Sequence, residues 1–316
     1  MNLKKPKFWD YKKPNIYAYC LQPLAYILQI INSVRLLVKI KSQKFKIKTI
    51  CIGNIYIGGT GKTSLSIKIN EILNSNNIRS CFIKKSYNSQ IDEKKILEKR
   101  GKVFSSFKRI DAINQAENEK FDVAILDDGL QDHTLKCDIN FVCFNNLNWV
   151  GNGLTIPAGP LRESIKNLKK YQHIFINGNN KHLSDIKKDI LKINPNINIH
   201  VGIYQPLNLH KFDKNDNYLV FSGIGNHETF ISMIKEHGLN ISKDIEFPDH
   251  YEYTGRDIEQ IIDQANVLKS KIITTEKDYL RLENYKPKEI KFIKSTLKII
   301  DEKKLINTII KSNETN

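Results

Sequence analysis

A glycine-rich stretch at residues 51–63, Cys-Ile-Gly-Asn-Ile-Tyr-Ile-Gly-Gly-Thr-Gly-Lys-Thr, constrains the fold of this chain more than any other segment. Residues 47–52, which lead into it, are mostly apolar and rich in β-branched side chains, and this pattern predicts a buried strand. Apolar residues at positions 65, 67, 69, 72 and 73 follow at close to helical spacing. A strand, a glycine-rich turn and a helix in this order are the setting of a phosphate-binding loop.

The residue types of this loop suit a nucleoside triphosphate. Glycine lets the backbone approach phosphate oxygens, and the first N–H groups of the following helix point at the anion. Lys62 would reach the β- and γ-phosphates, and the Thr63 hydroxyl would ligate Mg²⁺. We expect the following residues to bind ATP: Gly58, Gly59, Thr60, Gly61, Lys62 and Thr63. Tyr56 stands where the G-x-x-x-x-G-K-[ST] pattern begins with glycine, and an ordinary turn before a helix is the alternative.

The composition is that of a soluble α/β protein with about two domains. The chain has 316 residues, of which 40% are hydrophobic and 27% charged. Its net charge of +16 favours anionic partners, although a lysine-rich composition typical of AT-rich genomes accounts for part of this excess. We expect no nucleic-acid partner, because no basic stripe with interleaved aromatic residues is present. The five scattered cysteines form no C-x-x-C pair and indicate reduced thiols.

Residues 1–44 differ from the rest, because lysines flank a segment at 15–34 that carries no charge. The stretch 24–34, after Pro23, would span only about 16 Å as a helix, against about 30 Å for the hydrocarbon core of a bilayer. We therefore expect a helix that lies in the membrane interface with basic flanks near anionic headgroups. A helix that packs on the protein's own core is one alternative, and a spanning helix that accommodates the proline is another.

Strand and helix patterns alternate through the remaining chain, with strands expected near 79–84, 121–128, 138–144, 174–177, 199–204, 218–221 and 271–275. This alternation predicts α/β units with largely parallel sheets. We expect a P-loop NTPase-like α/β/α sandwich over residues 45–170 and a second α/β domain over 171–316 that closes the cleft. Residues 1–44 would form the membrane-associated segment.

Two further segments carry candidate chemistry. Asp127 and Asp128 end an apolar strand, where a carboxylate next to a phosphate-binding loop can hold Mg²⁺, although a strand-end aspartate also caps turns. The loop at 151–163 is rich in glycine and proline and delivers Arg162, an arginine suited to charge on a transferring phosphoryl group. A surface salt bridge with Glu163 is the alternative role for that arginine.

Five motifs occur in a fixed order: Gly-Asn-x3-Gly-Gly-Thr-Gly-Lys-Thr, Asp-Asp-Gly-Leu-Gln, Gly-Asn-Gly-x3-Pro-Ala-Gly-Pro-Leu-Arg-Glu, Phe-Pro-Asp-His and Thr-Thr-Glu-Lys-Asp. Together they resemble the tetraacyldisaccharide 4'-kinase family, the lipid A 4'-kinases, over nearly the whole chain. The resemblance implies ATP-dependent phosphorylation of the 4'-hydroxyl of an acylated glucosamine disaccharide 1-phosphate, with ATP and Mg²⁺ as cofactors. It implies two α/β/α domains and an N-terminal helix at the cytoplasmic face of the inner membrane. We expect a monomer.

The same resemblance implies roles for individual residues. Asp92, supported by His250, would be the general base, although a lone histidine is more often structural and Asp92 lies in a polar segment. Lys62 and Arg162 complete the expected catalytic set. Metal-side residues would be Thr63, Asp127, Asp128 and Gln131, and substrate-binding residues Asn152, Gly159, Arg162 and Glu163.

The chain also departs from the family pattern. Lys94 stands where the family has proline, and Lys85-Ser86-Tyr87-Asn88 replaces Arg-Gly-Tyr-Gly. A competing interpretation is a membrane-associated P-loop NTPase that acts as a regulatory or insertion factor. The product of the reaction separates the two hypotheses, because only a kinase transfers label from ATP to the disaccharide.

Overall fold

The glycine-rich loop follows a central strand of an eight-stranded sheet. This computed structural model describes residues 5–37, 42–86, 91–178, 182–249, 251–285 and 287–310. The strands of the large sheet are β1 (Lys48–Gly53), β2 (Ser80–Lys85), β3 (Val103–Ser106), β4 (Val123–Asp127), β5 (Ile139–Asn145), β6 (His173–Asn177), β7 (Asn198–Pro206) and β12 (Ser295–Ile299). Their order is β12-β7-β6-β5-β1-β4-β2-β3, and all neighbours are parallel except β7 and β12. The loop after β1 therefore lies at the carboxyl edge of a parallel sheet.

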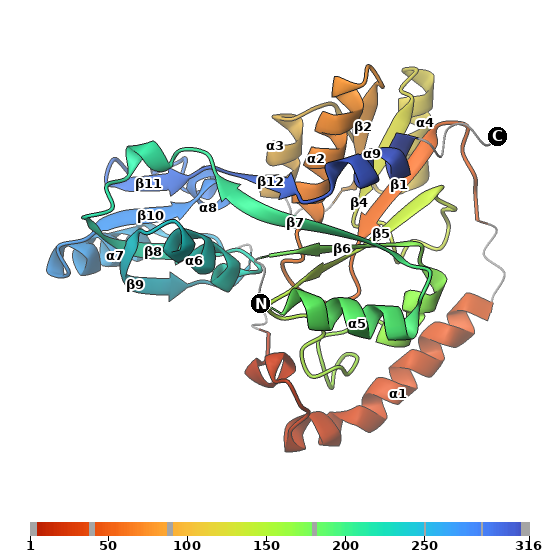
Figure 1. Cartoon of the computed structure of the whole chain (residues 1–316), viewed down its shortest axis with the longest axis horizontal. Coiled ribbons are helices and arrows are strands. Elements are labelled where there is room, and N and C mark those ends of the chain that lie inside the picture. Colours follow the sequence, from red (N-terminus) through yellow and green to blue (C-terminus); the bar gives the residue numbers. More distant parts are fainter. Residues whose placement is uncertain are drawn as a thin grey trace.

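Helices cover both faces of this sheet (Figure 1). On one face lie α2 (Lys62–Ser75), α3 (Ile91–Glu98) and α9 (Glu302–Ile310), and on the other α4 (Arg109–Asn118) and α5 (Leu183–Ile193). Leu65 and Ile69 of α2 pack on Ile50 and Phe82, whereas Ile113 of α4 packs on the opposite face. Because both faces are covered, the central strands β1 and β4 are buried almost throughout, as is usual in a parallel sheet.

The second sheet has four strands in the order β11-β10-β8-β9. They are β8 (Asn217–Ser222), β9 (Asn240–Glu246), β10 (Lys271–Thr275) and β11 (Ile290–Ile293), with α6 (His227–Glu236), α7 (Gly255–Val267) and α8 (Glu276–Arg281) around them. Thr254 caps α7 through a capping box with Asp257. We call this sheet with α6, α7 and α8 the second unit, and the large sheet with its helices the large unit.

The boundary expected between residues 170 and 171 is corrected by the strand pairing. That boundary falls before β6, yet β6 pairs directly with β5, and β7 pairs with β6. The chain enters the second unit only after β7 and returns through β12, which lies antiparallel to β7 (Figure 1). The apolar pattern of β6 and β7 predicts strands but does not reveal which sheet they join.

The N-terminal apolar segment forms α1 (Ile16–Leu37), which continues through Pro23. Ala18 and Ala25 are its buried apolar side chains among the described residues, and Gln29 Nε2 donates to the Thr155 hydroxyl. The helix thus rests on the protein along a narrow line of small residues. One side of α1 therefore packs on the protein itself, which is the alternative to a purely interfacial helix.

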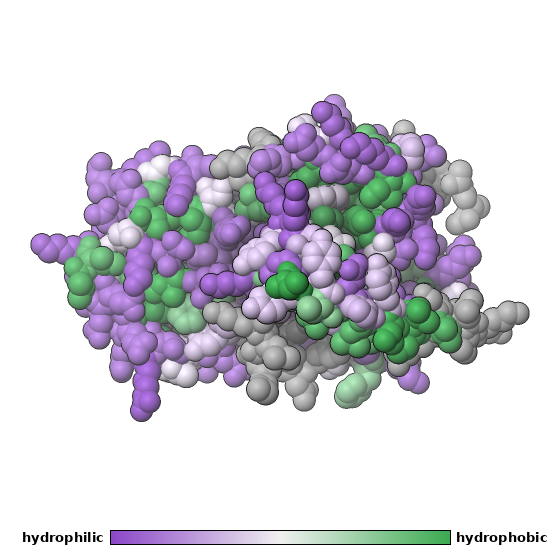
Figure 2. Space-filling model, turned by 90° about the horizontal axis from the view of Figure 1, so that it is seen from below, coloured by the Kyte–Doolittle hydropathy of each residue, from purple (hydrophilic) through white to green (hydrophobic). Residues whose placement is uncertain are grey.

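The remaining surface of α1 is unusually apolar. Exposed fractions reach 70% at Ile16, 53% at Ile27 and 63% at Ile30. The view from the side on which α1 lies shows a row of hydrophobic side chains along the molecule's edge (Figure 2). Within the described residues, no helix is both long enough and apolar enough to cross a membrane.

Candidate active site

The loop between β1 and α2 has the backbone of an anion cradle. Gly58 and Gly61 have φ values of +134° and +79°, which L side chains rarely adopt. Gly61 precedes the first residue of α2, Lys62, so the unpaired N–H groups of the helix open into the loop. These features agree with the phosphate-binding role expected for the loop.

Tyr56, the departure from the loop pattern, is buried rather than facing a ligand. Its hydroxyl donates to Asp10 at 2.5 Å, and Lys5 Nζ donates to the same hydroxyl at 3.0 Å. Asp10 ends the short 3-10 helix η1 (Lys7–Asp10). Burial, reinforced by Asp10, raises the pKa of Tyr56 and keeps the phenol protonated. Tyr56 therefore connects the glycine-rich loop to the N-terminal segment that carries Lys5 and Asp10.

The second unit touches the loop directly. Gly59 N donates to the carbonyl of Gly225 at 3.1 Å. A Cβ on Gly59 would lie 2.6 Å from Gly225 C, and a Cβ on Gly225 would lie 2.4 Å from Gly59 N. Both glycines are therefore required by this close backbone approach, which explains the Gly-x-Gly sequence that follows β8.

Buried amides at the ends of β5 and β6 continue this contact. Asn177 Nδ2 donates to the carbonyl of Thr60, and Asn145 Nδ2 donates to Asn177 Oδ1 at 2.9 Å. Asn145 Nδ2 also lies 2.9 Å from Thr229 Oγ1 in α6. The loop, the large sheet and the second unit are thus joined by one hydrogen-bonded network of buried side chains.

Asp127 and Thr63 lie together beside the loop. The β1–β4 register pairs Ile52 with Asp127, and Thr63 Oγ1 is 3.4 Å from Asp127 Oδ2. Asp127 is 2% exposed, and its Oδ1 is a buried oxygen without a hydrogen-bond partner in the described structure. A hydroxyl and a carboxylate with a spare oxygen form a donor set suited to Mg²⁺.

Lys62 and Arg162 converge on the next aspartate. Lys62 Nζ is 3.8 Å and Arg162 NH1 is 3.2 Å from Asp128 Oδ1, and the same Arg162 nitrogen donates to Gln131 Oε1 at 3.0 Å. Gln131 Nε2 in turn donates to a backbone carbonyl of the loop. Burial alone would raise the pKa of Asp128, but Lys62, Arg162 and Arg109 outweigh burial and hold that pKa below its usual value.

The other expected substrate residues have partners inside the 151–163 loop or next to it. Asn152 Nδ2 donates to the carbonyl of Ala158 at 2.9 Å, and a Cβ on Gly159 would lie 2.1 Å from Asn152 Oδ1. Glu163 accepts from Asn167 Nδ2 at 2.6 Å and from the Tyr171 hydroxyl at 2.8 Å. Asn152 and Gly159 therefore shape the loop that presents Arg162, and contact with substrate stays a prediction.

Two expected catalytic residues fall outside the description. Asp92 lies in α3, but its side chain is not among the described ones, and His250 lies outside the described residues. The structure therefore brings together Lys62, Thr63, Asp127, Asp128, Gln131 and Arg162 at one edge of the sheet.

Sequence reasoning missed two residues that support the site. Arg109 is 7% exposed and donates to the backbone carbonyl of Asp128 at 2.6 Å and to Asp132 at 3.1 Å. Asn177 holds the loop as described above. Neither lies in a recognisable motif, although an asparagine that ends an apolar strand is a weak signal at the carboxyl edge of a sheet.

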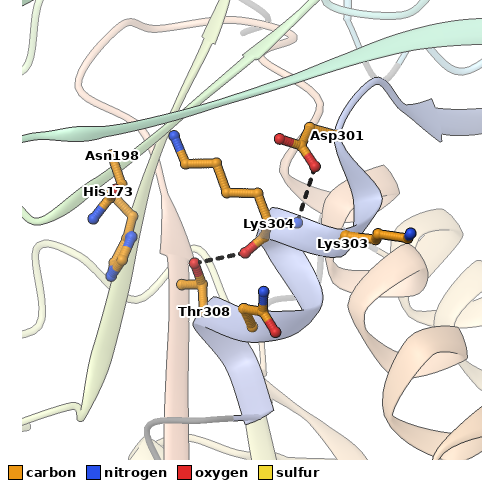
Figure 3. Close-up of a pocket in the computed structure, with 7 residues that line it drawn as sticks. His173, Asn198, Asp301, Lys303, Lys304 and Thr308 are labelled. Atoms are coloured by element: carbon orange, nitrogen blue, oxygen red, sulfur yellow. Dashed lines mark hydrogen bonds between the residues drawn. The ribbon is translucent and has the colours of Figure 1, made fainter.

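A cavity of about 570 Å³ lies elsewhere, between α9 and the starts of β6 and β7. Figure 3 shows Lys304 reaching from α9 toward the strands that carry His173 and Asn198. Because β1, β5, β6 and β7 run parallel, the starts of β6 and β7 lie at the edge opposite the glycine-rich loop. This cavity therefore does not belong to the candidate site.

An anion cradle at the carboxyl edge of a parallel sheet, with a loop lysine and a strand-end carboxylate beside it, defines the class of P-loop proteins that bind nucleoside triphosphates. The family described as Tetraacyldisaccharide-1-P 4'-kinase matches residues 17–314 of this chain. The chain belongs to this family, as its ordered motifs predicted.

Individual relatives agree with this assignment. The chain is 60% identical to a tetraacyldisaccharide 4'-kinase of Pelagibacter ubique (strain HTCC1062) over 316 residues, covering 100% of both proteins. It is 35% identical to a tetraacyldisaccharide 4'-kinase of Rickettsia bellii (strain OSU 85-389) over 300 residues, covering 89% of this chain and 90% of that protein.

A solved structure supports the fold. The crystal structure of LpxK from Aquifex aeolicus in complex with ATP matches with a TM-score of 0.67 and 21% sequence identity, covering 94% of this chain and 99% of that chain. The expected fold class, a P-loop α/β/α sandwich with a second α/β unit, is confirmed by this likeness and by the sheet topology.

Proposed function

We propose that this protein transfers the γ-phosphoryl group of ATP to the 4'-hydroxyl of an acylated glucosamine disaccharide 1-phosphate, a step of lipid A biosynthesis. Membership of the tetraacyldisaccharide 4'-kinase family supports the reaction class. The observation that carries the proposal for this chain is the convergence of Lys62 and Arg162 on Asp128 next to the glycine-rich loop. Two cations at one end of an anion cradle suit a reaction in which negative charge moves between phosphate oxygens.

The loop and α2 would bind the phosphates of ATP. Backbone N–H groups around Gly58 and Gly61 and the positive end of the α2 dipole stabilise the anion, while Lys62 adds a full charge. Arg162, from the loop at 151–163, would stabilise negative charge on the phosphoryl group during its transfer. Its two present partners, Asp128 and Gln131, orient the guanidinium before the substrate arrives.

The side chains beside the loop fit Mg²⁺. Thr63 and Asp127 would hold the ion, because the Asp127 Oδ1 atom lacks a hydrogen-bond partner in the described structure. The bound ion would supply neutralisation of charge on the β- and γ-phosphate oxygens. Asp128 and Gln131 remain part of the proposed metal side, although both now accept from Arg162.

Asp92 and His250 are the proposed residues that accept the proton of the sugar hydroxyl. A sugar hydroxyl is a weak nucleophile, so a carboxylate within hydrogen-bond reach, supported by an imidazole, would assist its attack. Asn152, Gly159 and Glu163 are proposed to line the acceptor side of the site through the loop they shape.

The acceptor is a lipid, and we propose that α1 brings the protein to the cytoplasmic face of the inner membrane. The exposed isoleucine, leucine and tyrosine side chains of α1 support an interfacial position. The net charge of +16 suits both anionic headgroups and a phosphorylated acceptor.

The decisive experiment follows label from γ-labelled ATP. We expect wild-type protein to transfer the label to a lipid-extractable disaccharide, and Lys62→Ala to reduce that transfer roughly 100-fold or more, since it removes a preorganised charge at the transferring group. Lys68→Ala is the matched control, because Lys68 lies on the same helix and pairs with Glu302 at the surface. Label released only as free phosphate would favour a regulatory NTPase and contradict the kinase proposal.

A further inference from the structure

Five side chains of alternating charge form a continuous series next to the candidate site. Lys84 Nζ lies 3.1 Å from Asp127 Oδ2 and 2.7 Å from Glu93 Oε2. Lys277 Nζ lies 3.3 Å from Glu93 Oε1 and 4.0 Å from Asp249 Oδ1. We call these five residues, Asp127, Lys84, Glu93, Lys277 and Asp249, the charge chain.

The charge chain is buried at one end and opens toward solvent at the other. The exposed side-chain fractions are 1% for Asp127, 4% for Lys84, 18% for Glu93, 20% for Lys277 and 38% for Asp249. A buried ammonium group is tolerated only when carboxylates pair with it. Burial alone would lower the pKa of Lys84, but Asp127 and Glu93 outweigh it and raise that pKa. The lysine is thus a permanent cation, and its position limits where Glu93 can lie.

The charge chain crosses from the large unit to the second unit. The β2–β4 register pairs Ile83 with Leu126, which places Lys84 at the end of β2 beside Asp127. Glu93 belongs to α3, which packs against α8, the helix of Lys277. Asp249 follows β9 in the second unit.

Apart from the charge chain, α3 has a modest attachment to the core. Leu97 is the one fully buried side chain among those the structure describes in this helix. A helix of eight residues, Ile91–Glu98, is too short to be stable without tertiary contacts. The ion pairs of Glu93 therefore supply a second fixed point one turn before Leu97.

Two members of the charge chain are sequence neighbours of the proposed proton acceptors. Asp92 directly precedes Glu93, and His250 directly follows Asp249. We propose that the charge chain is a positioning network in which Lys84 and Lys277 hold Glu93, and with it the start of α3, while Lys277 also holds Asp249, which follows β9. The network links the proposed base to the proposed metal ligand and to the second unit. This role rests on the proposed kinase function, because only that function makes Asp92 and His250 the residues that accept the proton of the sugar hydroxyl.

The first test compares catalysis with nucleotide binding. We expect Glu93→Gln and Lys277→Met each to lower kcat tenfold or more, because a displacement of about 1 Å from the reactive geometry costs about 100-fold. The Kd for ATP, measured without acceptor, should change less than about threefold, since Glu93 and Lys277 lie on α3 and α8, outside the glycine-rich loop. The double variant should lose little more than Glu93→Gln alone, as expected for residues that act as one unit.

Lys95→Met is the matched control. Lys95 also lies on α3 and reaches across to Glu283 at 3.9 Å, but both side chains are at least half exposed and lie outside the charge chain. Exposed ion pairs of this kind contribute little. The control should retain wild-type kcat and wild-type affinity for ATP.

The second test does not depend on the kinase reaction. Hydrogen exchange of the backbone amides of α3 should accelerate about tenfold in Glu93→Gln and Lys277→Met and stay unchanged in Lys95→Met. Unchanged exchange in α3 would overturn the positioning role whatever the activity of the variants. Equal losses of kcat and of ATP affinity would also overturn it, because they indicate general damage. A wild-type protein that transfers no label to the disaccharide removes the proposed function and this role with it.

Discussion

Arg162 illustrates how the site depends on single side chains from distant parts of the chain. Its guanidinium meets Lys62 at the carboxylate of Asp128, and the carboxylate keeps two cations close together that would otherwise repel each other. Arg109 fixes the backbone of the same aspartate by donating to its carbonyl oxygen. Asp128 itself has a φ of +59°, a conformation that these contacts compensate.

The proposed proton acceptors can be tested as single residues. We expect Asp92→Asn and His250→Ala each to reduce turnover of the disaccharide roughly tenfold or more, the low end of the loss of a general base, while ATP still binds. Steady-state kinetics and equilibrium binding of ATP measure the two quantities separately. His237→Ala is a suitable control, because that histidine bonds to Met233 at the end of α6, away from the loop. Wild-type turnover in both variants would contradict the assignment.

Residues in local motifs could be predicted from the sequence, whereas residues with distant partners could not. Lys62 and Asp127 were predictable because the chemistry of a phosphate-binding loop constrains residue types at short spacing. The buried position of Lys84 was not predictable, because its carboxylate partners come from β4 and α3 and no local sequence pattern indicates a buried lysine. Asn177 was missed for the same reason, since its partner Thr60 lies 117 positions away.

Among the elements, strands with continuous apolar runs were predictable and short or half-exposed ones were not. β4 and β8 were expected, and both are buried almost throughout. β9 was missed because its side chains are mostly exposed, so no apolar run marks it. β12 has five residues and returns to the large sheet after the whole second unit, a long-range pairing that local periodicity does not report.

α1 leads to a prediction about membrane binding. Ile27 and Ile30 are one helical turn apart and more than half exposed. Burial of such a side chain in an apolar medium stabilises binding by about 1.5–3 kcal/mol. Changing both residues to serine should therefore lower the affinity for vesicles that contain anionic lipid about tenfold or more, as measured by co-sedimentation.

The control for this prediction is Phe107→Ser. Phe107 is 83% exposed but lies between β3 and α4 rather than on α1. Vesicle binding of this variant should equal that of the wild type. Equal binding by the α1 variant and the wild type would remove the interfacial role proposed for the helix.

At the scale of the whole molecule, the site is assembled where the second unit adjoins the large one. The chain passes into the second unit through β7 and returns through β12, so two paired strands form the covalent connection (Figure 1). Non-covalent contacts also join the two units. Gly59 of the glycine-rich loop bonds to Gly225, Asn145 of β5 bonds to Thr229 of α6, and Glu93 of α3 pairs with Lys277 of α8. A change in the relative position of the units would therefore alter the loop and α3 together.

The stability of the whole molecule should also depend on pH through two histidines remote from the site. Burial, together with the charge of Lys304, lowers the pKa of His173 from 6.5 to about 4. Burial, together with His173 and Lys304, lowers the pKa of His200 to about 4. An imidazole whose pKa is lower in the folded than in the unfolded protein binds more protons when unfolded. Its contribution to stability is present above pH 6.5 and is lost as the pH falls toward 4.

We therefore expect the melting temperature to fall between pH 7 and pH 5. The contribution of His200, which is 3% exposed, amounts to roughly 2 kcal/mol at pH 5. The variant His200→Phe should flatten this dependence without loss of hydrogen bonds, because neither ring nitrogen of His200 has a partner in the described structure. The carboxyl groups of Asp128 and Asp132, whose pKa values lie below 3.8, affect the stability only at lower pH.

Thermal unfolding at pH 7 and pH 5 measures the effect, with exposed His210→Phe as the control. If the melting temperature of His200→Phe fell with pH as steeply as that of the wild type, the result would contradict the prediction.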